Sequence, residues 1–419
     1  MVAVIMAGGR GTRIASVNSA VPKPLLPVAG KPVLEHEIEC LKRQNITDIT
    51  LTVGHLAEQI CDYFGSGRRF GVHIEYIREK TPMGTGGALY YLKGRVSGDF
   101  LLLNGDMIFD VDFQRLMEFH KVRNADATLL VHPNDHPYDS GIIAADRDGR
   151  VEHWITKEDE RRWYSNCVNA GVHAMSPRLL EMLDEPKKMD LDRDILKPSI
   201  PSGRIYAYRS PEYVKDMGTP ERIRDVEYDL QTKLVWNRNL GRKQKAVFLD
   251  RDGTINKYKG FLRDIDDFEL MDGAAEAIRQ INRSGYLTIV VTNQPVIARG
   301  EVTWEELYEI HRKMETLLGQ QGAYVDDIFI CPHHPDKGFP GERQEYKIDC
   351  DCRKPKPGLL LRAAEKYNID LSRSWMIGDS LSDLLAGEAA GCRTALIDKH
   401  HSLMDTVNLI KTNVQNKFV

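Results

Sequence analysis

One pattern occurs twice in this chain and limits its fold more than any other feature. A short apolar run, VAVIM at 2–6, leads directly into a glycine-rich loop, and a second run, AVFLD at 246–250, leads into another glycine-containing turn. After each opening, strand-length apolar runs alternate with helix-length amphipathic segments. This alternation is typical of α/β proteins, in which helices cover a mainly parallel sheet. We therefore predict two doubly wound, Rossmann-like α/β domains.

The expected elements follow a similar order in both halves. In the first half we expect helices near 34–44 and 56–64 and strands at 48–53, 72–77 and 100–104. In the second half we expect helices at 273–284 and 303–318 with a strand at 287–291 between them, and Thr303 and Glu306 have capping-box spacing. A charged, predicted helix at 219–245 separates the halves. The predicted limits are 1–225 for the first domain, 226–244 for a linker helix, 245–400 for the second domain and 401–419 for a C-terminal helix or tail.

Composition restricts the partners of the chain. Its 419 residues carry 57 Lys and Arg against 61 Asp and Glu, which gives a formal net charge of −4. Nucleic-acid binding needs a clustered excess of positive charge, so we expect no nucleic-acid partner. The apolar runs are strand-sized, well below the roughly 20 residues of a membrane span. The first residues lack the charged region and the cleavage site of an export signal, so we expect none. We expect no membrane association and a cytoplasmic location, and the sequence leaves open whether the chain forms a homo-oligomer.

The first glycine-rich loop, AGGRGTR at 7–13, has the composition of a phosphate-binding loop. Its glycines allow a tight turn that brings backbone N–H groups close to a ligand. Arg13, and Lys23 further on, supply positive charge where a polyphosphate would lie. An ordinary turn between a strand and a helix fits such a loop equally well. The continuation PKPLLPVAGKP at 22–32 makes the pattern specific.

With this continuation the first half resembles the sugar-1-phosphate nucleotidyltransferase family over residues 1–225. Further motifs follow in that family's order: EKTPMGTGGAL at 79–89, NGD at 104–106, NAG at 169–171 and KDMGTPE at 215–221. The resemblance implies that Asp106 and Asp216 hold a Mg²⁺ ion that bridges phosphates. It also implies the residues that bind the nucleotide and the sugar phosphate, which are Gly8, Gly9, Gly11, Thr12, Gly84, Thr85, Gly86, Lys157, Asn169 and Gly171.

The reaction implied by this resemblance is attack by an oxygen of a sugar 1-phosphate on the α-phosphorus of a nucleoside triphosphate, with pyrophosphate leaving. Catalysis then rests on alignment of the two phosphates and on charge neutralisation by Mg²⁺, Arg13 and Lys23. The chain departs from the family pattern at Thr156, where many members carry a Glu before the lysine that corresponds to Lys157. The sugar-hydroxyl contact made by that Glu is therefore not assigned in this chain.

The second half opens with FLDRDGTIN at 248–256, which places Asp250 and Asp252 at the end of an apolar strand. Two carboxylates at this spacing can act as nucleophile and general acid/base on one phosphoryl group when a cation offsets their repulsion. An isolated Asp-Gly turn fits this segment as well. The chain then resembles the haloacid dehalogenase superfamily over about 245–400, because that family's motifs follow in order: VVTNQ at 290–294, CRKPKPG at 352–358 and IGDSLSD at 377–383.

That resemblance implies a role for each matching residue. Asp250 is the nucleophile that forms an aspartyl phosphate, and Asp252 is the acid that protonates the leaving alkoxide and then activates water. Thr292 and Lys354 are implied to hold the transferring phosphoryl group, and Asn293 to contact the substrate. The implied ligands of a Mg²⁺ ion are Asp250, the backbone carbonyl of Asp252 and Asp379. Asp383 is expected to lie outside the ligands of the metal. About twenty residues separate Asp252 from the helix at 273, too few for an inserted cap domain.

A cluster of metal-ligand types follows the spacing CxH and then CxC, at Cys331, His333, Cys350 and Cys352. Thiolates and imidazole are the ligands of a closed tetrahedral zinc site, which leaves no position for a catalytic water. We therefore expect a structural Zn²⁺ ion, with His334 as the alternative ligand to His333. The polar segment 335–349 is too poor in apolar residues to form a core, and a bound metal would supply its order.

The zinc pattern, together with CPHHP, CDCRKP and ARG at 298–300, narrows the second resemblance to the heptose bisphosphate phosphatases and the related histidinol phosphatases. This resemblance implies that Arg353 is placed to bind the second phosphate of the substrate. Pro295 stands where many members have Ser, so one hydroxyl contact is not assigned. The zinc loop is then expected to form a wall over the phosphatase site.

The first half is most similar to the heptose-1-phosphate guanylyltransferases, through VNSAVPKPLLPVAGKP and NGDMIFDVDF. The two resemblances imply consecutive steps on small-molecule substrates. Removal of the 7-phosphate from D-glycero-D-manno-heptose 1,7-bisphosphate gives heptose 1-phosphate. Transfer of a nucleotide from GTP, or from another nucleoside triphosphate, then gives an activated heptose, with Mg²⁺ needed in both domains.

Two other interpretations remain open. In one, the transferase uses another sugar 1-phosphate, that of mannose or glucose, and the phosphatase is of the histidinol-phosphatase type. In the other, the first half is a regulatory domain that binds a sugar nucleotide without turnover and is fused to an active phosphatase. The carboxylates at 106, 216, 250, 252 and 379 favour catalysis, because a binding module has no need of so many repelling charges.

Overall fold

The computed structural model describes residues 1–9 and 20–415, and the chain divides into two compact units. The first unit comprises Met1–His132, Ile143–Trp154 and Asn169–Asn239. The second unit comprises Pro133–Ile142, Ile155–Val168 and the chain from Leu240 onward. Two short stretches from the first half of the sequence thus belong to the second unit. The limits 1–225, 226–244, 245–400 and 401–419 for the domains, linker and tail stay a prediction.

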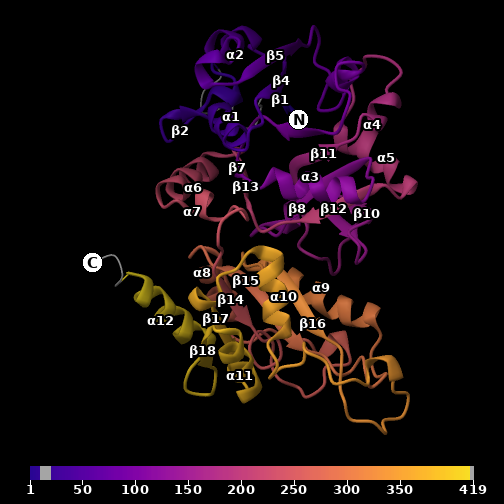
Figure 1. Ribbon diagram of the computed structural model, residues 1–419, viewed down its shortest axis with the longest axis vertical. Coiled ribbons are helices and arrows are strands. Elements are labelled where there is room, and N and C mark those ends of the chain that lie inside the picture. Colours follow the sequence, from indigo (N-terminus) through magenta and orange to yellow (C-terminus); the bar gives the residue numbers. More distant parts are fainter. Residues whose placement is uncertain (10–19, 416–419) are drawn as a thin grey trace. The chain divides into compact units, whose positions relative to one another are not determined.

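The first unit is built on a mixed sheet (Figure 1). Strand β1 (Val2–Met6) pairs in parallel with β4 (Asp48–Val53) and β6 (Phe100–Asn104), whereas β11 (Val168–Met175) pairs antiparallel with β6. The order along the sheet is β10 (Val151–Ile155), β9 (Ile142–Ala145), β11, β6, β1, β4 and β5 (His73–Arg78), and β8 (Ala127–His132) joins β11 to β12 (Ile205–Arg209). The predicted α/β class is confirmed, with a mixed rather than a purely parallel sheet in this unit.

Helix α1 (Val33–Arg43) shows why helices cover this sheet. Its residues Leu34, Ile38 and Leu41 recur every three or four positions and lie in one buried core with Ile5 and Leu51 of the sheet. The other described helices of the unit are α2 (Ala57–Phe64), α3 (Phe113–Val122), α4 (Arg178–Glu181), α5 (Lys197–Ser199), α6 (Pro220–Gln231) and α7 (Leu234–Asn237). Two short strand pairs complete it, β2 (Pro27–Val28) with β3 (Lys31–Pro32) and β7 (Met107–Asp110) with β13 (Tyr213–Asp216).

The charged segment at the end of this unit does not form the single linker helix expected over 226–244. It forms α6 and α7, separated by Thr232 and Lys233. Lys233 has a φ of 60°, a left-handed conformation that a continuous right-handed helix does not contain. Helix α6 begins at a capped end, because the side chain of Thr219 accepts a hydrogen bond from the N–H of Arg222.

The second unit contains a parallel sheet in the order β16 (Asp327–Cys331), β15 (Leu287–Asn293), β14 (Ala246–Leu249), β17 (Trp375–Gly378) and β18 (Arg393–Leu396). The unit's first strand, β14, is central, and the chain reaches β15 on one side and later β17 on the other. Ligands of open α/β sheets bind where the connections diverge, at the carboxyl ends of such strands. Asp250, Thr292 and Asp379 all lie at that edge.

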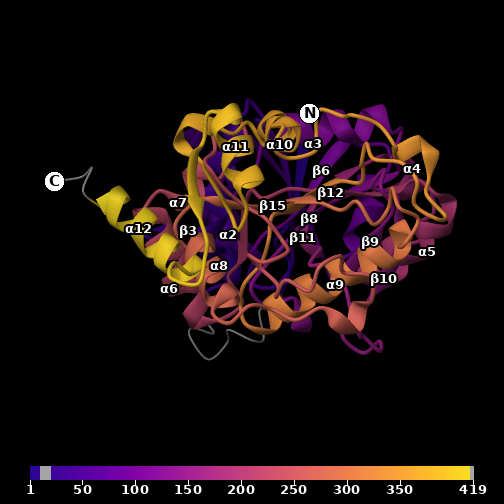
Figure 2. The same ribbon diagram turned by 90° about the horizontal axis from the view of Figure 1, so that it is seen from below.

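Helices α8 (Ala274–Asn282), α9 (Trp304–Gln320), α10 (Gly358–Tyr367), α11 (Leu381–Ala390) and α12 (Leu403–Gln415) belong to the second unit, and α8 and α12 lie side by side (Figure 2). The capping box predicted at Thr303 and Glu306 is present at the start of α9. Between β14 and α8 every residue is described, and this stretch holds one short helical turn and no inserted domain. No helix within the described residues is both long and apolar enough to cross a lipid bilayer.

The stretches Pro133–Ile142 and Ile155–Val168 pack against α9, which accounts for their place in the second unit. The backbone N–H of Tyr164 donates to Oγ1 of Thr316 at 2.9 Å, and that hydroxyl donates to the carbonyl oxygen of Tyr164 at 3.1 Å. A Cβ on Gly319 would come within 2.6 Å of the ring of Pro137, so the helix presents a glycine where the loop approaches it.

Candidate active sites

In the first unit, two glycines of the predicted phosphate loop follow β1. Gly8 lies against Glu79, the first residue of the EKTPMGTGGAL motif, and a Cβ on Gly8 would come within 2.9 Å of Oε1 of Glu79. The glycine therefore leaves room for that carboxylate, and the structure brings the two motifs together. Gly9 has open space where a Cβ would point. The predicted ligands Gly11, Thr12 and Arg13 lie outside the described residues.

Lys23 contacts the first of the two carboxylates predicted to hold Mg²⁺. Its Nζ lies 2.7 Å from Oδ2 of Asp106, which stands between β6 and β7. The Lys23 side chain is 11% exposed and that of Asp106 is 31% exposed. The Lys23 side chain is thus nearly enclosed by protein, whereas the Asp106 carboxylate keeps a surface open to a ligand.

The second carboxylate reaches the same place by strand pairing. Strand β13 pairs antiparallel with β7, so Asp216 lies opposite Met107, and the N–H of Met217 donates to the carbonyl oxygen of Asp106 at 2.9 Å. Asp106 and Asp216 therefore stand on adjacent chain segments, although half the domain separates them in sequence. Arg222 from the first turn of α6 forms an ion pair with Asp216. Oxygen ligands from adjacent segments suit Mg²⁺.

A buried glutamate that the motifs did not reveal lies behind this pair. Glu37 of α1 is fully buried, and its Oε1 accepts a hydrogen bond from the N–H of Met107 at 3.1 Å. Burial raises the pKa of Glu37 well above its ordinary value, the hydrogen bond opposes that rise and the charge of Asp106 adds to it. Glu37 thus anchors the backbone of the residue next to Asp106. Its only sequence signal is a carboxylate on the apolar face of a predicted helix.

The predicted base-reading loop is fixed to a segment that the motifs did not include. Gly84 has a φ of +73°, and a Cβ there would come within 2.3 Å of the carbonyl oxygen of Met189. The N–H of Gly86 donates to that same oxygen at 2.9 Å. The hydroxyl of Thr85 donates to Oδ2 of Asp190 at 3.1 Å and accepts from the N–H of Leu191 at 2.8 Å. These groups hold the loop in place, and their role in nucleotide binding stays a prediction.

The NAG motif lies next to the NGD motif. Gly171 has a φ of +70°, and a Cβ there would come within 2.4 Å of Nδ2 of Asn104, so only glycine fits this approach. Asn169 accepts a hydrogen bond from the N–H of Gly171 at 3.3 Å. A further carboxylate, Asp192, stands beside Asn169: burial and the charge of Asp190 raise the pKa of Asp192 to about 7, while a hydrogen bond from Asn169 opposes the rise.

Lys157 differs from the other predicted ligands, because it belongs to the stretch that packs with the second unit. Its Nζ lies 4.0 Å from Oε1 of Glu158, and its side chain is exposed. The neighbouring Thr156 uses its backbone N–H and its hydroxyl to bind Oδ2 of Asp159, at 2.6 and 2.8 Å. The phosphate contact of Lys157 stays a prediction.

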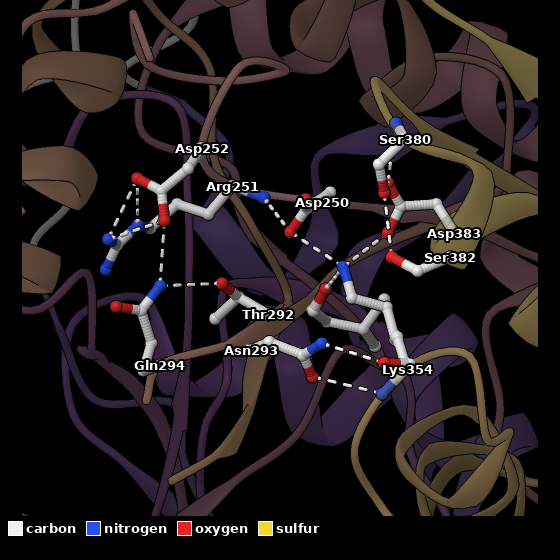
Figure 3. Close-up of polar contacts among 11 residues, drawn as sticks. Asp250, Arg251, Asp252, Thr292, Asn293, Gln294, Lys354, Ser380, Ser382 and Asp383 are labelled. Carbon is white, nitrogen blue, oxygen red and sulfur yellow. Dashed lines mark hydrogen bonds and ion pairs between the residues drawn. The ribbon is translucent and has the colours of Figure 1, made fainter. Parts of the chain in front are cut away.

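In the second unit, Asp250 stands directly after β14, and Figure 3 shows the contacts around it. Its Oδ1 accepts a hydrogen bond from the N–H of Arg251 at 2.7 Å and lies 2.8 Å from Nζ of Lys354. Burial raises the pKa of Asp250 to about 6, Lys354 opposes this rise, and the charge of Asp383 adds to it. The carboxylate is therefore mostly ionised at neutral pH, which is the state that the predicted nucleophilic role requires.

Lys354 is enclosed by oxygens. Its Nζ also lies 2.6 Å from Oδ1 of Asp383 and donates to the carbonyl oxygen of Val291 at 2.9 Å. Burial lowers the pKa of Lys354, but the two aspartates outweigh it and the net shift is upward. Asn293 holds the backbone of Lys354 through two hydrogen bonds of 3.1 Å, one accepted and one donated. In the structure Asn293 thus positions the lysine, and its contact to the substrate stays a prediction.

The carboxylate of Asp252 is surrounded by donors. Nδ2 of Asn256 donates to Oδ1 at 3.0 Å and Nε2 of Gln294 donates to Oδ2 at 2.8 Å, while Arg251 contacts both oxygens. Burial alone raises the pKa of Asp252, but the charge of Arg251 and these hydrogen bonds together lower it below its ordinary value. Gln294 also donates to the hydroxyl of Thr292 at 2.8 Å. Gln294 is a residue of the VVTNQ motif for which the sequence indicated no role.

Three carboxylates at the carboxyl edge of the parallel sheet are placed to bind a cation. Asp250, Asp379 and Asp383 each offer an oxygen, and these oxygens lie within 4.8 Å of one another. Gly253 has a φ of +83°, and a Cβ there would come within 2.0 Å of Oδ2 of Asp379, so a glycine is needed for this carboxylate to approach. Asp383 is tied to Lys354 and to the hydroxyl of Ser380 at 2.7 Å. Oxygen-rich surroundings of this kind suit Mg²⁺.

The four predicted zinc ligands come together in the structure. Sγ of Cys352 lies 3.2 Å from that of Cys331 and 3.3 Å from that of Cys350, and Nδ1 of His333 lies 3.3 Å from Sγ of Cys352. A tetrahedral ion with metal–sulfur bonds of about 2.3 Å separates its sulfur ligands by about 3.8 Å. Sγ of Cys331 lies 3.6 Å from that of Cys350 and 3.7 Å from Nδ1 of His333, close to this spacing. The alternative ligand His334 instead accepts from the N–H of Asp336 at 3.2 Å. The cluster therefore fits a four-ligand metal site with His333 as its histidine.

Two arginine side chains contact the segment that carries the predicted zinc ligands. Nη1 of Arg353 donates to the carbonyl oxygen of His333 at 3.2 Å. The guanidinium of Arg299, from the ARG sequence at 298–300, lies between two aromatic rings, 4.0 Å from the centroid of Phe261 and 4.3 Å from that of Phe339. The predicted contact of Arg353 to a second phosphate is not tested by these distances.

Comparison with known protein families gives two matches. The nucleotidyl transferase model matches residues 2–233 and the haloacid dehalogenase-like hydrolase model matches residues 127–391. Each match covers more than half of the chain, and the two overlap. Together they account for most of the sequence.

Individual relatives match one part of the chain each. The D-glycero-beta-D-manno-heptose-1,7-bisphosphate 7-phosphatase of Pasteurella multocida is 44% identical over 157 residues, which are 37% of this chain and 82% of that protein. HddC from Yersinia pseudotuberculosis, solved with GMP-PN, covers 55% of this chain and 99% of its own at 26% identity, with a TM-score of 0.48. The D,D-heptose 1.7-bisphosphate phosphatase from B. bronchiseptica, solved with magnesium and phosphate, covers 41% of this chain and 99% of its own at 31% identity, with a TM-score of 0.36.

Two enzyme families thus meet in one polypeptide, and each carries its own cluster of carboxylates paired with a lysine. The chain belongs to the nucleotidyl transferase family through its N-terminal part and to the haloacid dehalogenase-like hydrolase family through its C-terminal part.

Proposed function

We propose that this chain is a bifunctional enzyme that makes a nucleotide-activated heptose. The second unit hydrolyses the 7-phosphate of D-glycero-D-manno-heptose 1,7-bisphosphate, and the first unit transfers GMP from GTP to the resulting heptose 1-phosphate. The products are phosphate, pyrophosphate and GDP-heptose. The observation that carries the proposal is the 44% identity to a protein named for the first of these reactions, over 82% of its length, in a chain that also matches the nucleotidyl transferases.

The phosphatase reaction begins with an attack by Asp250. One of its carboxylate oxygens forms a bond to the phosphorus of the 7-phosphate, and the bond between that phosphorus and the sugar oxygen breaks. Asp252 gives its proton to the departing oxygen. Its pKa is low in the free protein, and the negative phosphate of a bound substrate raises it by like-charge repulsion. Lys354 and the hydroxyl of Thr292 hold the transferring group.

The second step regenerates the enzyme. Asp252, now ionised, takes a proton from a water molecule, whose oxygen attacks the phosphorus of the aspartyl phosphate and releases Asp250 and inorganic phosphate. A Mg²⁺ ion held by Asp250, Asp379 and the backbone carbonyl of Asp252 would neutralise the phosphoryl oxygens. The close oxygens of Asp250 and Asp379 support this site.

The transferase reaction needs positioning and charge more than covalent chemistry. An oxygen of heptose 1-phosphate attacks the α-phosphorus of GTP, and the bond to the pyrophosphate oxygen breaks. Lys23 and Arg13 neutralise the phosphates, and Asp106 with Asp216 would hold a Mg²⁺ ion that binds them. The adjacent positions of Lys23, Asp106 and Asp216 support these roles. The choice of guanine rests on the resemblance of the phosphate-loop and NGD segments to guanylyltransferases.

The cysteine and histidine cluster is proposed to hold a structural Zn²⁺ ion. Four protein ligands fill a tetrahedral ion, so no position remains for a reacting water. The polar loop between His333 and Cys350 has few apolar residues of its own, and the ion would fix it at both ends.

The experiment that tests this proposal separates the two reactions. Heptose 1,7-bisphosphate without nucleotide measures phosphate release, and heptose 1-phosphate with each of GTP, ATP, CTP and UTP measures pyrophosphate release. We expect phosphate in the first assay, and pyrophosphate only with GTP in the second. Pyrophosphate with mannose or glucose 1-phosphate but not with heptose 1-phosphate would contradict the proposed sugar, and no pyrophosphate from any sugar would indicate a regulatory first unit.

A further inference from the structure

Arg251 lies between the two aspartates of the phosphatase motif, and its side chain is fully buried. Its Nε donates to Oδ1 of Asp252 at 3.2 Å, and its Nη2 contacts Oδ1 and Oδ2 at 2.9 and 2.8 Å (Figure 3). Its third nitrogen, Nη1, lies 3.0 Å from Nε2 of His311 in α9. All three guanidinium nitrogens have protein partners, so Arg251 is not arranged to bind a substrate phosphate.

The histidine in this contact is neutral. His311 is 4% exposed, and burial, with the charge of Arg251, lowers its pKa to about 3. A guanidinium can only donate hydrogen bonds, so Nε2 of His311 is the acceptor and the ring proton is on Nδ1. The contact is therefore a directed hydrogen bond between two buried side chains.

The orientation of the Asp252 carboxylate depends on this chain of contacts. The guanidinium is a planar fork, and its two donors on Asp252 set the plane of the carboxylate. The hydrogen bond to His311 fixes the opposite edge of that fork. Asn256 and Gln294 support one carboxylate oxygen each, at 3.0 and 2.8 Å. Among the described residues, only Arg251 forms hydrogen bonds to both oxygens.

We propose that His311 is a positioning residue for proton transfer by Asp252, acting through Arg251. This inference rests on the proposed phosphatase reaction. In its first step an oxygen of Asp250 bonds to phosphorus, the bond from phosphorus to the sugar oxygen breaks, and the proton of Asp252 passes to that departing oxygen. A tilted Asp252 carboxylate leaves the attack of Asp250 intact but delivers the proton poorly.

The test compares leaving groups that differ in their need for a proton. Single-turnover rates are measured by rapid quench with two substrates. Heptose 1,7-bisphosphate has a sugar alkoxide as its leaving group, which needs a proton. The leaving group of p-nitrophenyl phosphate needs none. We expect His311→Leu to slow the first substrate about tenfold or more, within the roughly 10²–10⁴-fold contribution of a general acid. The rate with the aryl substrate should change less than about threefold, because Asp250 and Lys354 are untouched.

Three matched comparisons make the result decisive. His311→Gln keeps an acceptor and should recover most of the loss with the heptose substrate. Met314→Ala removes fully buried apolar volume from the same helix and should leave the ratio of the two rates unchanged. The pH profile with the heptose substrate should shift in His311→Leu, whereas a merely structural defect lowers the whole profile evenly.

Other outcomes overturn the inference or its basis in distinguishable ways. Equal slowing of both substrates by His311→Leu, an unchanged rate in that variant, or a Gln variant no better than Leu would each contradict the positioning role. A wild-type protein that releases no phosphate from heptose 1,7-bisphosphate would contradict the proposed phosphatase function instead.

Discussion

Nζ of Lys354 lies 2.8 Å from Oδ1 of Asp250, so the cation of one motif contacts the carboxylate of another at the carboxyl edge of the parallel sheet. Burial pushes the pKa of Asp250 upward and the lysine opposes that push, with a balance at about 6. This contact keeps a buried carboxylate ionised near neutral pH. In the proposed reaction it also places the charge of the lysine beside the transferring phosphoryl group.

The pH dependence of phosphate release should report this balance. Asp250 must be ionised to attack, so kcat/KM should fall as the pH drops through about 6 when Mg²⁺ is limiting. A bound cation favours the ionised carboxylate, so this acidic limb should move to lower pH as the Mg²⁺ concentration is raised. If the acidic limb of the pH profile stayed in place over a wide range of Mg²⁺ concentrations, Asp250 could not be both the attacking carboxylate and a ligand of the metal.

Gly253 offers a test of the cation site that avoids changing its ligands. In Gly253→Ala the new Cβ would come within 2.0 Å of Oδ2 of Asp379, so we expect phosphate release to fall at least ~100-fold and its Mg²⁺ requirement to rise. Gly260→Ala is the matched control, because Gly260 has a similar φ of +74° but open space around its Cβ. The control should lose about 1–2 kcal/mol of stability, the cost of the left-handed backbone alone, and should keep its activity. Equal activity in the two variants would argue against a close approach of Asp379.

Loss of one cluster cysteine should release the metal. Cys350 and Cys392 are both 9% exposed, but only Cys350 belongs to the four-ligand cluster. Elemental analysis after dialysis should find about one zinc per chain in the wild type and in Cys392→Ser, and almost none in Cys350→Ser. The Tm of Cys350→Ser should fall by about 5 °C or more, because metal binding stabilises the folded loop. Zinc retained by Cys350→Ser would remove the basis for this site.

The two activities should be separable by single substitutions. Asp250→Asn removes the attacking carboxylate and should lower phosphate release at least ~10³-fold, while transfer to supplied heptose 1-phosphate continues. Asp106→Asn should lower nucleotide transfer by a comparable factor and leave phosphate release intact. Each variant is the folding control for the other. If either substitution disabled both reactions in a folded protein, the assignment of separate sites would be wrong.

Much of this arrangement could be predicted from the sequence, because its signals are local. The apolar runs and their amphipathic neighbours indicated most of the elements near their observed bounds, from α1 at Val33–Arg43 to α9 at Trp304–Gln320. The CxH and CxC pairs keep their ligands within two positions of each other, so only one long-range contact had to form. The expected linker helix was wrong, because Lys233 adopts a left-handed backbone conformation that divides the segment. A lysine gives no sequence signal of such a turn, as a glycine would.

The parts that the sequence did not indicate depend on contacts between distant residues. Glu37, Asp192 and His311 resemble ordinary helix residues until the fold places them beside Met107, Asn169 and Arg251. The packing of Ile155–Val168 on α9 likewise depends on contacts between residues about 150 positions apart, such as those of the Tyr164 backbone with the Thr316 hydroxyl. Such partners follow from the shape of the folded chain and carry no periodicity or motif.

The most direct test of the bifunctional account is a ³¹P NMR time course of the full chain with Mg²⁺, heptose 1,7-bisphosphate and GTP. The account predicts that the signal of the 7-phosphate decays first into inorganic phosphate, and that pyrophosphate and a nucleoside diphosphate sugar then appear together from the heptose 1-phosphate. Loss of the 1-phosphate signal before the 7-phosphate signal, or phosphate release that is never followed by a sugar nucleotide, would contradict it.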